Sequence, residues 1–192
     1  MKIVFATRNL NKVREINEIF DDAIEIIGLD DIGCTKEIPE TQKTIQGNAL
    51  QKARYVKRNF EVDCFSEDTG LEVDALHGEP GVITAHYAGP ERNADANMAK
   101  VLGKLIGQKD RGAQFRTVIA LILDGKEYTF EGIARGHIAM QKQGEKGFGY
   151  DPIFIPEGYE QSFAELSAEE KNRISHRGKA TEQLKAFLAE YK

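Results

Sequence analysis

Residues 2–12 read K-I-V-F-A-T-R-N-L-N-K, an apolar run that turns polar at Arg8. The apolar run suits a buried strand, and apolar residues between Val13 and Phe20 then recur at helical spacing. Asn11 is expected to cap the start of that helix. With a second strand predicted over residues 24–29, the chain opens as strand, loop, helix and strand, which is the start of an α/β fold.

The rest of the chain continues this alternation. A long helix is predicted after a loop over residues 30–44, because Ala49, Ala53, Val56 and Phe60 form one apolar stripe. Further strands are predicted over residues 62–66, 70–75 and 153–155, and further helices around 98–105, after the capping-box pattern Ser167 to Glu170, and over 178–191.

The clearest local prediction is a β-hairpin. Strands over residues 115–123 and 127–138 flank Asp124-Gly125, the dipeptide typical of a two-residue type I′ turn. A chain of 192 residues fits one domain. We therefore expect a single α/β domain over residues 1–192, with a mixed sheet split by a cleft.

Composition excludes several classes of protein. The net charge is −5 and the 26 basic residues are dispersed, which argues against a surface for duplex nucleic acid. No apolar run approaches the ~20 residues of a membrane span. The first residues are expected to form a strand rather than a signal peptide, and Cys34 and Cys64 lack CxxC spacing. We therefore expect reduced thiols in a cytoplasmic protein.

Residues 65–70, F-S-E-D-T-G, place Glu67 and Asp68 together where a core strand is expected to end in a Thr-Gly turn. Adjacent carboxylates are costly to desolvate unless a cation or hydrogen-bond donors compensate them. Together with Glu40, and with no Cys or His cluster nearby, they suit Mg²⁺ or Mn²⁺ as oxygen ligands. The alternative is a solvated strand end.

The loop from Thr7 to Lys12 joins a strand to a helix. Backbone N–H groups at a helix N-terminus favour a bound anion, and Lys12 would add a charge. The loop contains neither a Walker-type P-loop nor a dinucleotide fingerprint, and a plain capped turn is the alternative.

Two later stretches complete the candidate site. In G-E-K-G-F-G-Y-D-P (144–152), Phe148 and Tyr150 alternate with glycines, so that a ring would stack on a ligand; a loop with core aromatics is the alternative. Asp151, held extended by the following proline, is expected to accept hydrogen bonds. Residues 169–178 form the densest cationic group of the chain. The alternative is that these cations only stabilise the C-terminal end of a helix. Together the four groups fit a triphosphate beside a metal, with an aromatic platform for a base.

Five motifs carry a family resemblance over nearly the whole chain. They are A-T-R-N-L-N-K (6–12), E-T (40–41) before N-A-x-x-K-A (48–53), S-E-D-T-G-L (66–71), G-F-G-Y-D-P-I-F (147–154) and E-K-N-x-I-S-H-R-G (170–178). In this order they resemble the inosine triphosphate pyrophosphatase family. The resemblance implies an elongated α/β fold with a central mixed β-sheet flanked by helices, two lobes with a cleft, and a homodimer. It also implies Mg²⁺-assisted hydrolysis of ITP, dITP and XTP to the monophosphate and pyrophosphate, which removes them from the nucleotide pool.

The resemblance also implies residue roles. Asp68 would be the catalytic acid-base residue, and Glu40 and Asp68, assisted by Glu67, would hold the metal. Residues 148–151 would hold the base, and His176 with Arg177 would read its 6-oxo group. The implied substrate-binding residues are Thr7, Arg8, Asn9, Leu10, Asn11, Lys12, Lys52, Thr69, Phe148, Gly149, Tyr150, Asp151, Lys171, His176 and Arg177.

One departure and several alternatives stand beside this prediction. Many bacterial members read S-A-R-Y where this chain has T-A-H-Y (84–87), so contacts of that arginine are not carried over to His86. A nucleotide-sensing module and a Maf-type pyrophosphatase for pyrimidine or methylated nucleotides would use similar residues. A nuclease would need a basic stripe, and a glycosidase-type carboxylate pair leaves the cationic group unexplained.

Overall fold

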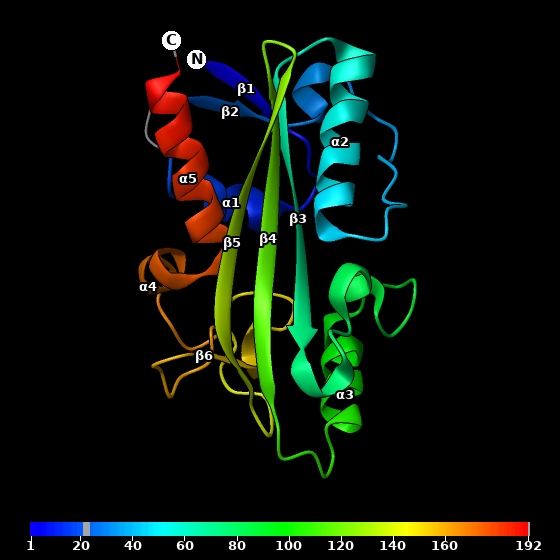
Figure 1. Ribbon diagram of the computed structural model, residues 1–192, viewed down its shortest axis with the longest axis vertical. Coiled ribbons are helices and arrows are strands. Elements are labelled where there is room, and N and C mark those ends of the chain that lie inside the picture. The colour runs from blue at the N-terminus through cyan, green and yellow to red at the C-terminus, as the bar shows by residue number, and fades with distance from the viewer. Residues whose placement is uncertain (21–23, 192) are drawn as a thin grey trace. The chain divides into compact units, whose positions relative to one another are not determined.

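The computed structural model describes residues 1–20 and 24–191 and shows one mixed sheet with helices beside it (Figure 1). The strand order is β2-β1-β3-β4-β5-β6. Strand β1 pairs in parallel with β2 and β3, whereas β5 and β6 are antiparallel. The predicted α/β class and mixed sheet are confirmed.

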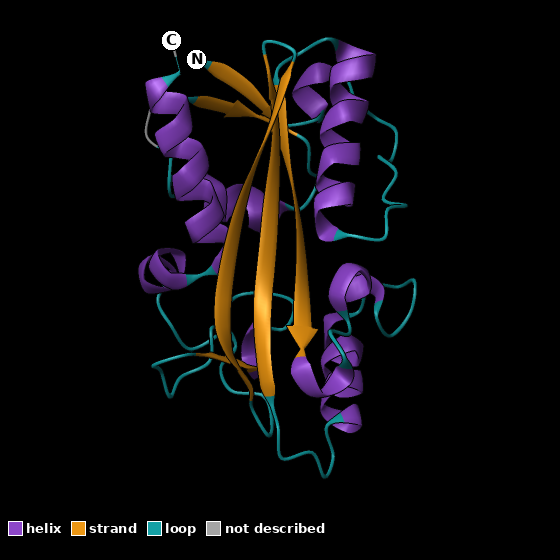
Figure 2. Ribbon diagram, viewed as in Figure 1, coloured by secondary structure: helices purple, strands orange, loops and turns teal. Residues whose placement is uncertain are grey.

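Helices and strands are interspersed along the chain, and Figure 2 distinguishes them by colour. The strands are β1 (Lys2–Phe5), β2 (Glu25–Ile27), β3 (Cys64–Val73), β4 (Gly112–Leu123), β5 (Lys126–Ile138) and β6 (Phe154–Pro156). The α-helices are α1 (Leu10–Asn17), α2 (Ile45–Phe60), α3 (Ala94–Lys104), α4 (Ala168–Ile174) and α5 (His176–Glu190). Short 3₁₀ helices are η1 (Asp30–Ile32), η2 (Asp74–Leu76), η3 (Gly81–His86) and η4 (Asp151–Ile153). Within the described ranges, none of the helices has the length and apolar content needed to cross a bilayer.

The chain divides into two compact units. The first unit comprises Met1–Asp68, Thr117–Gly132 and Arg177–Lys192, and the second comprises Thr69–Arg116 and Ile133–His176. Strands β3, β4 and β5 each contribute residues to both units. The cleft expected between two lobes stays a prediction.

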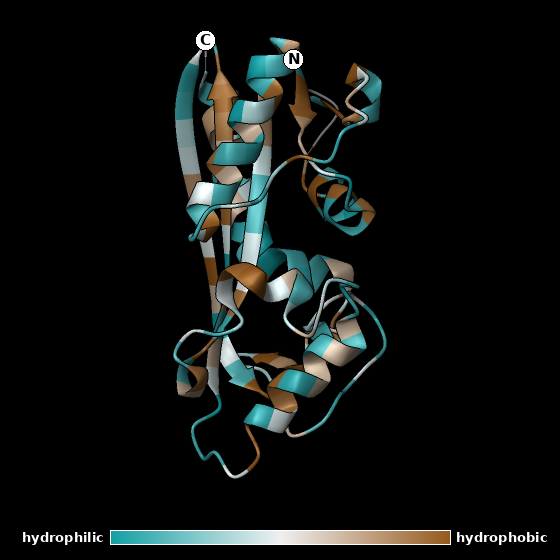
Figure 3. Ribbon diagram, turned by 90° about the vertical axis from the view of Figure 1, so that its right-hand side faces the viewer, coloured by the Kyte–Doolittle hydropathy of each residue, from teal (hydrophilic) through white to brown (hydrophobic). Residues whose placement is uncertain are grey.

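The first unit is built on an apolar core that the opening strand supplies. Phe5 of β1 stacks on Phe65 of β3, with ring centroids 4.5 Å apart, and Ile16 of α1 is fully buried in the same cluster. Helix α2 buries Ala49 and Ala53, as its predicted stripe requires. Figure 3 shows helices that carry both brown and teal residues, as expected when one face packs inward and the other meets water.

The second unit has a separate core. Phe115 of β4 contacts the rings of Phe154 and Phe163, and Val101 of α3 lies in the same cluster. Strand β6 pairs with β5 with Gly136 opposite Pro156 and His137 opposite Ile155. A Cβ on Gly136 would lie 2.2 Å from the Ile155 carbonyl oxygen, so this close pairing requires glycine.

Strand β3 corrects the sequence prediction at its most important point. The strand does not end at the two carboxylates, because Cys64–Val73 is one continuous strand without the predicted Thr-Gly turn. The pairing of β1 with β3, Val4 with Cys64 and Phe5 with Phe65, fixes where the strand begins. Since successive side chains of a strand point to opposite faces, Glu67 and Asp68 are directed apart.

Three helix and turn boundaries also differ from the predictions. Asn9, rather than Asn11, caps α1, and its side chain accepts from the N–H groups of Asn11 and Lys12. Helix α5 begins at His176 rather than residue 178, so His176 and Arg177 are its first two residues. The 3₁₀ helix η4 includes Asp151, which is therefore not extended, and the predicted strand begins one residue later, at Phe154.

Other local predictions are confirmed. The hairpin turns at Asp124 and Gly125, whose φ values of 49° and 75° are both positive, as a type I′ turn requires. Ser167 caps α4 by accepting from the Glu170 N–H. Cys34 and Cys64 are buried free thiols, and burial raises the pKa of Cys64 to about 12, which is typical of an unreactive thiol.

Candidate functional site

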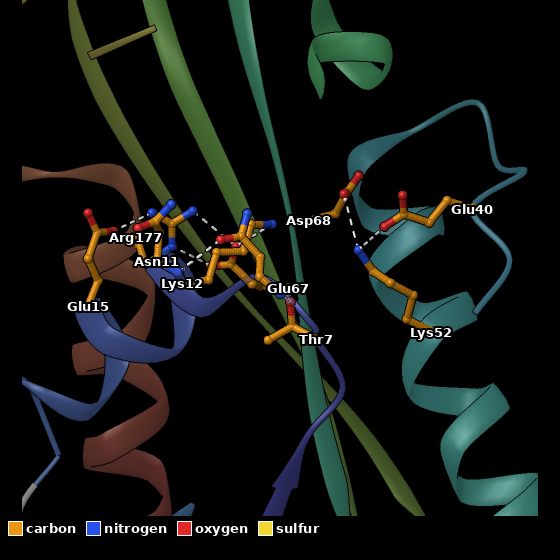
Figure 4. A network of polar contacts seen from close by, with 10 residues as sticks. Thr7, Asn11, Lys12, Glu15, Glu40, Lys52, Glu67, Asp68 and Arg177 are labelled. Atoms are coloured by element: carbon orange, nitrogen blue, oxygen red, sulfur yellow. Dashed lines mark hydrogen bonds and ion pairs between the residues drawn. The ribbon is translucent and has the colours of Figure 1, made fainter. Parts of the chain in front are cut away.

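The Asp68 carboxylate lies at the inner end of a short ion-paired chain in the first unit. Lys52 of α2 places its ammonium between Glu40 and Asp68, 3.3 Å from Asp68 Oδ1 (Figure 4). Asp68 is 8% exposed, and its Oδ2 has no hydrogen-bond partner among the described residues. One carboxylate oxygen is therefore held, and the other is available to a ligand.

Burial makes the protonated form of Asp68 more favourable than that of an ordinary aspartate. Burial raises the pKa of Asp68, nearby Glu40 adds to the rise, and the Lys52 and Lys12 ammoniums only partly oppose it. Burial also disfavours the charged form of Lys52, but Asp68 and Glu40 outweigh it and raise the Lys52 pKa. A carboxylate with a raised pKa beside a fixed cation is suited to accepting a proton from water.

Glu67 is directed to a different set of partners. Its two oxygens accept from Arg177, with Nε–Oε2 2.7 Å and Nη2–Oε1 3.0 Å, and Oε1 also lies 2.7 Å from the Lys12 ammonium. Arg177 donates in addition to Glu15 of α1. Figure 4 shows Glu67 and Asp68 pointing away from each other, as the strand geometry requires.

The Glu67 network is electrostatically satisfied although it is buried. Burial alone would raise the pKa of Glu67, but the Arg177 guanidinium and the Lys12 ammonium hold the pKa below its ordinary value. Burial likewise disfavours charged Arg177, and Glu67 and Glu15 reverse this and raise its pKa. These pKa shifts keep Glu67 and Arg177 ionised together across the neutral pH range.

These contacts separate the three proposed metal ligands. Glu40 and Asp68 share Lys52, and carboxylate oxygens of this kind fit Mg²⁺, which takes one or two carboxylates together with phosphate oxygens and water. Asp68 Oδ2 is a buried oxygen without a hydrogen-bond partner in the described part of the chain, so a water molecule or a cation would satisfy it. Both Glu67 oxygens already accept charged hydrogen bonds, which fits a metal ligand poorly. No cluster of three or more carboxylate, His or Cys side chains suited to a metal occurs in residues 1–20 and 24–191.

The loop before α1 forms an exposed helix start. The Asn9 side chain accepts hydrogen bonds from the backbone N–H groups of Asn11 and Lys12. Thr7 Oγ1 in turn accepts from the Asn9 N–H at 3.1 Å. Arg8 pairs with Asp30 at 2.8 Å and also donates to the Cys34 carbonyl. Leu10 is 81% exposed, an unusual position for a large apolar side chain. The loop predicted to bind phosphate is thus a capped turn whose surface is open to solvent.

In the second unit, the two aromatics of the glycine-rich loop differ. Tyr150 is 3% exposed, donates its hydroxyl to the Thr84 carbonyl at 2.6 Å, and has a pKa raised by burial. Phe148 is only half-buried. Of the two rings predicted to hold a base, Phe148 is partly exposed to solvent, whereas Tyr150 belongs to the core.

The remaining predicted residues of the second unit are buried or half-buried. Lys171 of α4 pairs with Asp151 at 2.7 Å. His176 stacks on Phe115, with centroids 4.5 Å apart and planes at 15°, and Thr69 is half-buried on β3. The predicted positions in this unit, Thr69, Phe148, Gly149, Tyr150, Asp151, Lys171 and His176, all lie on strand, loop or helix-start segments.

Glu15 is the member of the first-unit cluster that was not predicted. It lies on α1, 6% exposed, and holds the Arg177 side chain. Its spacing of three residues after Lys12 places both on one helix face, which was the only local signal. The signal is weak because an exposed helix shows the same spacing.

Comparison with known proteins identifies the family of this chain. The pattern of the Ham1 family matches residues 3–187. The chain is 56% identical to a protein named dITP/XTP pyrophosphatase from Flavobacterium johnsoniae, with 96% of each chain covered, and 53% identical to one of the same name from Flavobacterium psychrophilum, with 98% and 99% covered. The structure of the Staphylococcus aureus Ham1 protein superposes with a TM-score of 0.92 at 39% identity, covering all of both chains. These matches confirm the family resemblance drawn from the motifs, and the chain belongs to the Ham1 family.

Proposed function

We propose that this protein is a nucleoside triphosphate pyrophosphatase that hydrolyses ITP, dITP and XTP to the monophosphate and pyrophosphate. The observation that carries the proposal is the buried Asp68 carboxylate, with one oxygen held by Lys52 and the other without a partner. The names of the relatives, dITP/XTP pyrophosphatase, point to the same reaction. Its biological effect would be to remove these non-standard purine nucleotides from the nucleotide pool.

The hydrolysis requires water to attack the α-phosphorus, so that a P–O bond to water forms as the bond to the β-phosphate bridge breaks. Asp68 Oδ2 accepts the water proton, since the raised pKa makes this carboxylate a stronger base than usual. Lys52 keeps Oδ1 in place and compensates negative charge nearby. Pyrophosphate leaves with the electron pair of the broken bond.

Mg²⁺ would be held by Glu40 and Asp68 and, when bound, would neutralise phosphate charge and polarise the reacting phosphate. We assign Glu67 to another task, because both of its oxygens are occupied by Arg177 and Lys12. In this proposal Glu67 holds Lys12 at the start of α1, where the ammonium meets the triphosphate. Mn²⁺ would be bound by the same oxygen ligands.

Recognition of the base is assigned to the second unit and to the start of α5. Phe148 stacks on the purine, His176 with Arg177 reads its 6-oxo group, and Lys171 contacts the substrate. A 6-amino group would present donors to these donors and leave them unpaired, which is worth ~10²-fold or more in discrimination. We further propose a cytoplasmic homodimer, which light scattering after size-exclusion chromatography tests.

The deciding experiment is a substrate panel. We expect kcat/KM with Mg²⁺ to be ~10²-fold or more higher for ITP, XTP and dITP than for ATP and GTP, with pyrophosphate as product. Equal values for ATP, GTP and ITP would disprove the base recognition. Release of orthophosphate would disprove the cleavage position, and nucleotide binding without hydrolysis would favour a sensing module. Preference for pyrimidine or methylated nucleotides would favour the Maf-type alternative.

A further inference from the structure

Phe148 lies in a turn in which Asp151 makes two hydrogen bonds to it, one through its backbone N–H and one through its carboxylate. The Asp151 N–H donates to the Phe148 carbonyl at 3.2 Å, and the Phe148 N–H donates to Asp151 Oδ2 at 2.8 Å. Asp151 is 3% exposed and starts η4, so its backbone is fixed by that 3₁₀ helix and by Pro152. The carboxylate therefore sets the backbone position from which the Phe148 ring projects.

The same oxygen also holds a cation beneath that ring. Asp151 Oδ2 accepts from the Lys171 ammonium at 2.7 Å, and both side chains are more than nine-tenths buried. The ammonium lies 5.0 Å from the centroid of the Phe148 ring, within the range at which a cation is attracted to an aromatic face. The Asp151 carboxylate thus positions Phe148 in two ways. It accepts the Phe148 N–H, and it holds the Lys171 ammonium against the Phe148 ring.

Gly147 provides the space that the carboxylate occupies. Its φ is +73°, and an added Cβ would lie 2.2 Å from Asp151 Oδ2 and 2.9 Å from Cγ. Gly149, two residues later, has a φ of +63° but no atom within 4 Å of an added Cβ. Gly149 is thus required only for backbone conformation, whereas Gly147 is required for conformation and for the Asp151 contact.

We propose that Asp151 is a positioning residue for purine recognition, acting through Phe148 and Lys171 and dependent on glycine at position 147. This inference rests on the proposed function and changes the expected role of Asp151, which is no longer to touch the base. Loss of the carboxylate would leave the stacking ring and the ammonium displaced. The affinity for ITP would decrease, while proton transfer to Asp68 would continue.

A double-mutant cycle on Gly147 and Asp151 tests the proposal. We expect Gly147→Ala and Asp151→Ala each to raise KM for ITP about tenfold, with kcat changed less than about threefold. In the Asp151→Ala background, Gly147→Ala should raise KM by a smaller factor than in wild type, because Oδ2 and Cγ are gone and only the contact with the Cβ of residue 151, at 3.0 Å, remains. Gly158→Ala is the control for backbone strain, since its φ is +82° and an added Cβ meets nothing within 4 Å. Fully multiplicative effects on KM would overturn the proposal.

Asp151→Asn separates the two contacts of the carboxylate. Its amide oxygen can still accept from the Phe148 N–H, but it is a weaker partner for Lys171, so KM should rise less than in Asp151→Ala. A rise equal to that of Asp151→Ala would overturn the part assigned to the Phe148 hydrogen bond.

A readout without nucleotide distinguishes this inference from the proposed function. In the ligand-free protein, amide hydrogen exchange at Phe148 should be about tenfold faster in Asp151→Ala than in wild type, and close to wild type in Gly158→Ala. Failure of the wild type to hydrolyse ITP would overturn the proposed function. Equal exchange at Phe148 in wild type and Asp151→Ala would overturn the role of Asp151 even if ITP is hydrolysed.

Discussion

Two neighbouring carboxylates of β3 do different work because a strand directs successive side chains to opposite faces. Asp68 faces Lys52 and keeps one oxygen without a partner, whereas both oxygens of Glu67 are occupied. The repulsion expected between adjacent carboxylates is thereby relieved by geometry as well as by cations. Substitution of each residue should consequently affect a different property.

Asp68→Asn should abolish most turnover while leaving the fold intact. The amide has nearly the same volume but cannot accept the water proton, so we expect kcat for ITP to fall by ~10²- to 10⁴-fold. The thermal unfolding midpoint should remain within a few degrees of wild type. The measurement is pyrophosphate release with Mg²⁺ alongside calorimetry, and near-normal kcat would remove Asp68 from its assigned role.

Glu67→Gln should instead reduce stability. The change removes the Glu67 carboxylate from buried Arg177, which keeps its bond to Glu15, and breaking a buried ion pair costs about 3–5 kcal/mol of unfolding free energy. Glu127→Gln is the matched control, because Glu127 makes a two-pronged pair with Arg54 at 2.7 Å on the surface, where such pairs contribute about 1 kcal/mol or less. Urea unfolding measures both, and equal losses would contradict the burial argument.

At the scale of elements, helix starts decide where the charged side chains lie. Asn9 caps α1 and Asn93 caps α3, each by accepting N–H groups of the first turn. Only the first of these caps lies beside Lys12, whose ammonium is held by Glu67. Local capping is therefore connected with the proposed phosphate-binding loop in one helix and is purely structural in the other.

Asn9→Ala and Asn93→Ala should differ in activity but not in stability. Each removes one cap and should lower the unfolding free energy by about 1 kcal/mol. Only Asn9→Ala should lower kcat/KM for ITP, because it releases the backbone that carries Lys12. Comparison of urea unfolding with steady-state kinetics checks this. A similar fall in kcat/KM in both variants would show that the effect is one of stability.

The elements also show which features a sequence can predict. The hairpin was predictable because Asp124 and Gly125 are adjacent and their conformational preferences are local. The site motifs were predictable from their residue types and order. The continuity of β3 was not, because its Thr-Gly pair is typical of a turn and only pairing with other strands makes the strand continue. Glu15 was missed because its partner Arg177 lies 162 residues away in sequence.

At the scale of the whole molecule, the buried network links stability to pH. The pKa of Glu67 is lower in the folded protein than in the unfolded chain, because Arg177 and Lys12 overcome the cost of burial. Its contribution to stability is therefore complete above the unfolded value, close to pH 4.5, and is lost as the pH falls toward the folded value. Protonation of this one carboxylate removes the charge that balances both cations.

The unfolding free energy of the wild type should accordingly decrease as the pH falls below about 4.5. The decrease should be smaller in Glu67→Gln. The difference in unfolding free energy between wild type and Glu67→Gln should shrink as the pH falls. Chemical denaturation at a series of pH values measures this difference. A difference that stays constant with pH would show that Glu67 does not carry the linkage. The hydrogen bond with Arg54 also lowers the pKa of Glu127, but that carboxylate is exposed, so the change with pH should be smaller for Glu127→Gln.

The alternation of Glu67 and Asp68 along β3 has a consequence for how this stretch tolerates changes in length. Removing or inserting one residue before position 67 would exchange the faces, so that Asp68 would be directed toward Arg177 and Glu67 toward Lys52. A loop would absorb such a change, but a strand paired on both sides cannot. The count of residues between Phe65 and the carboxylates is thus as strictly determined as their chemical identity, and single-residue deletions here should be more damaging than most single substitutions.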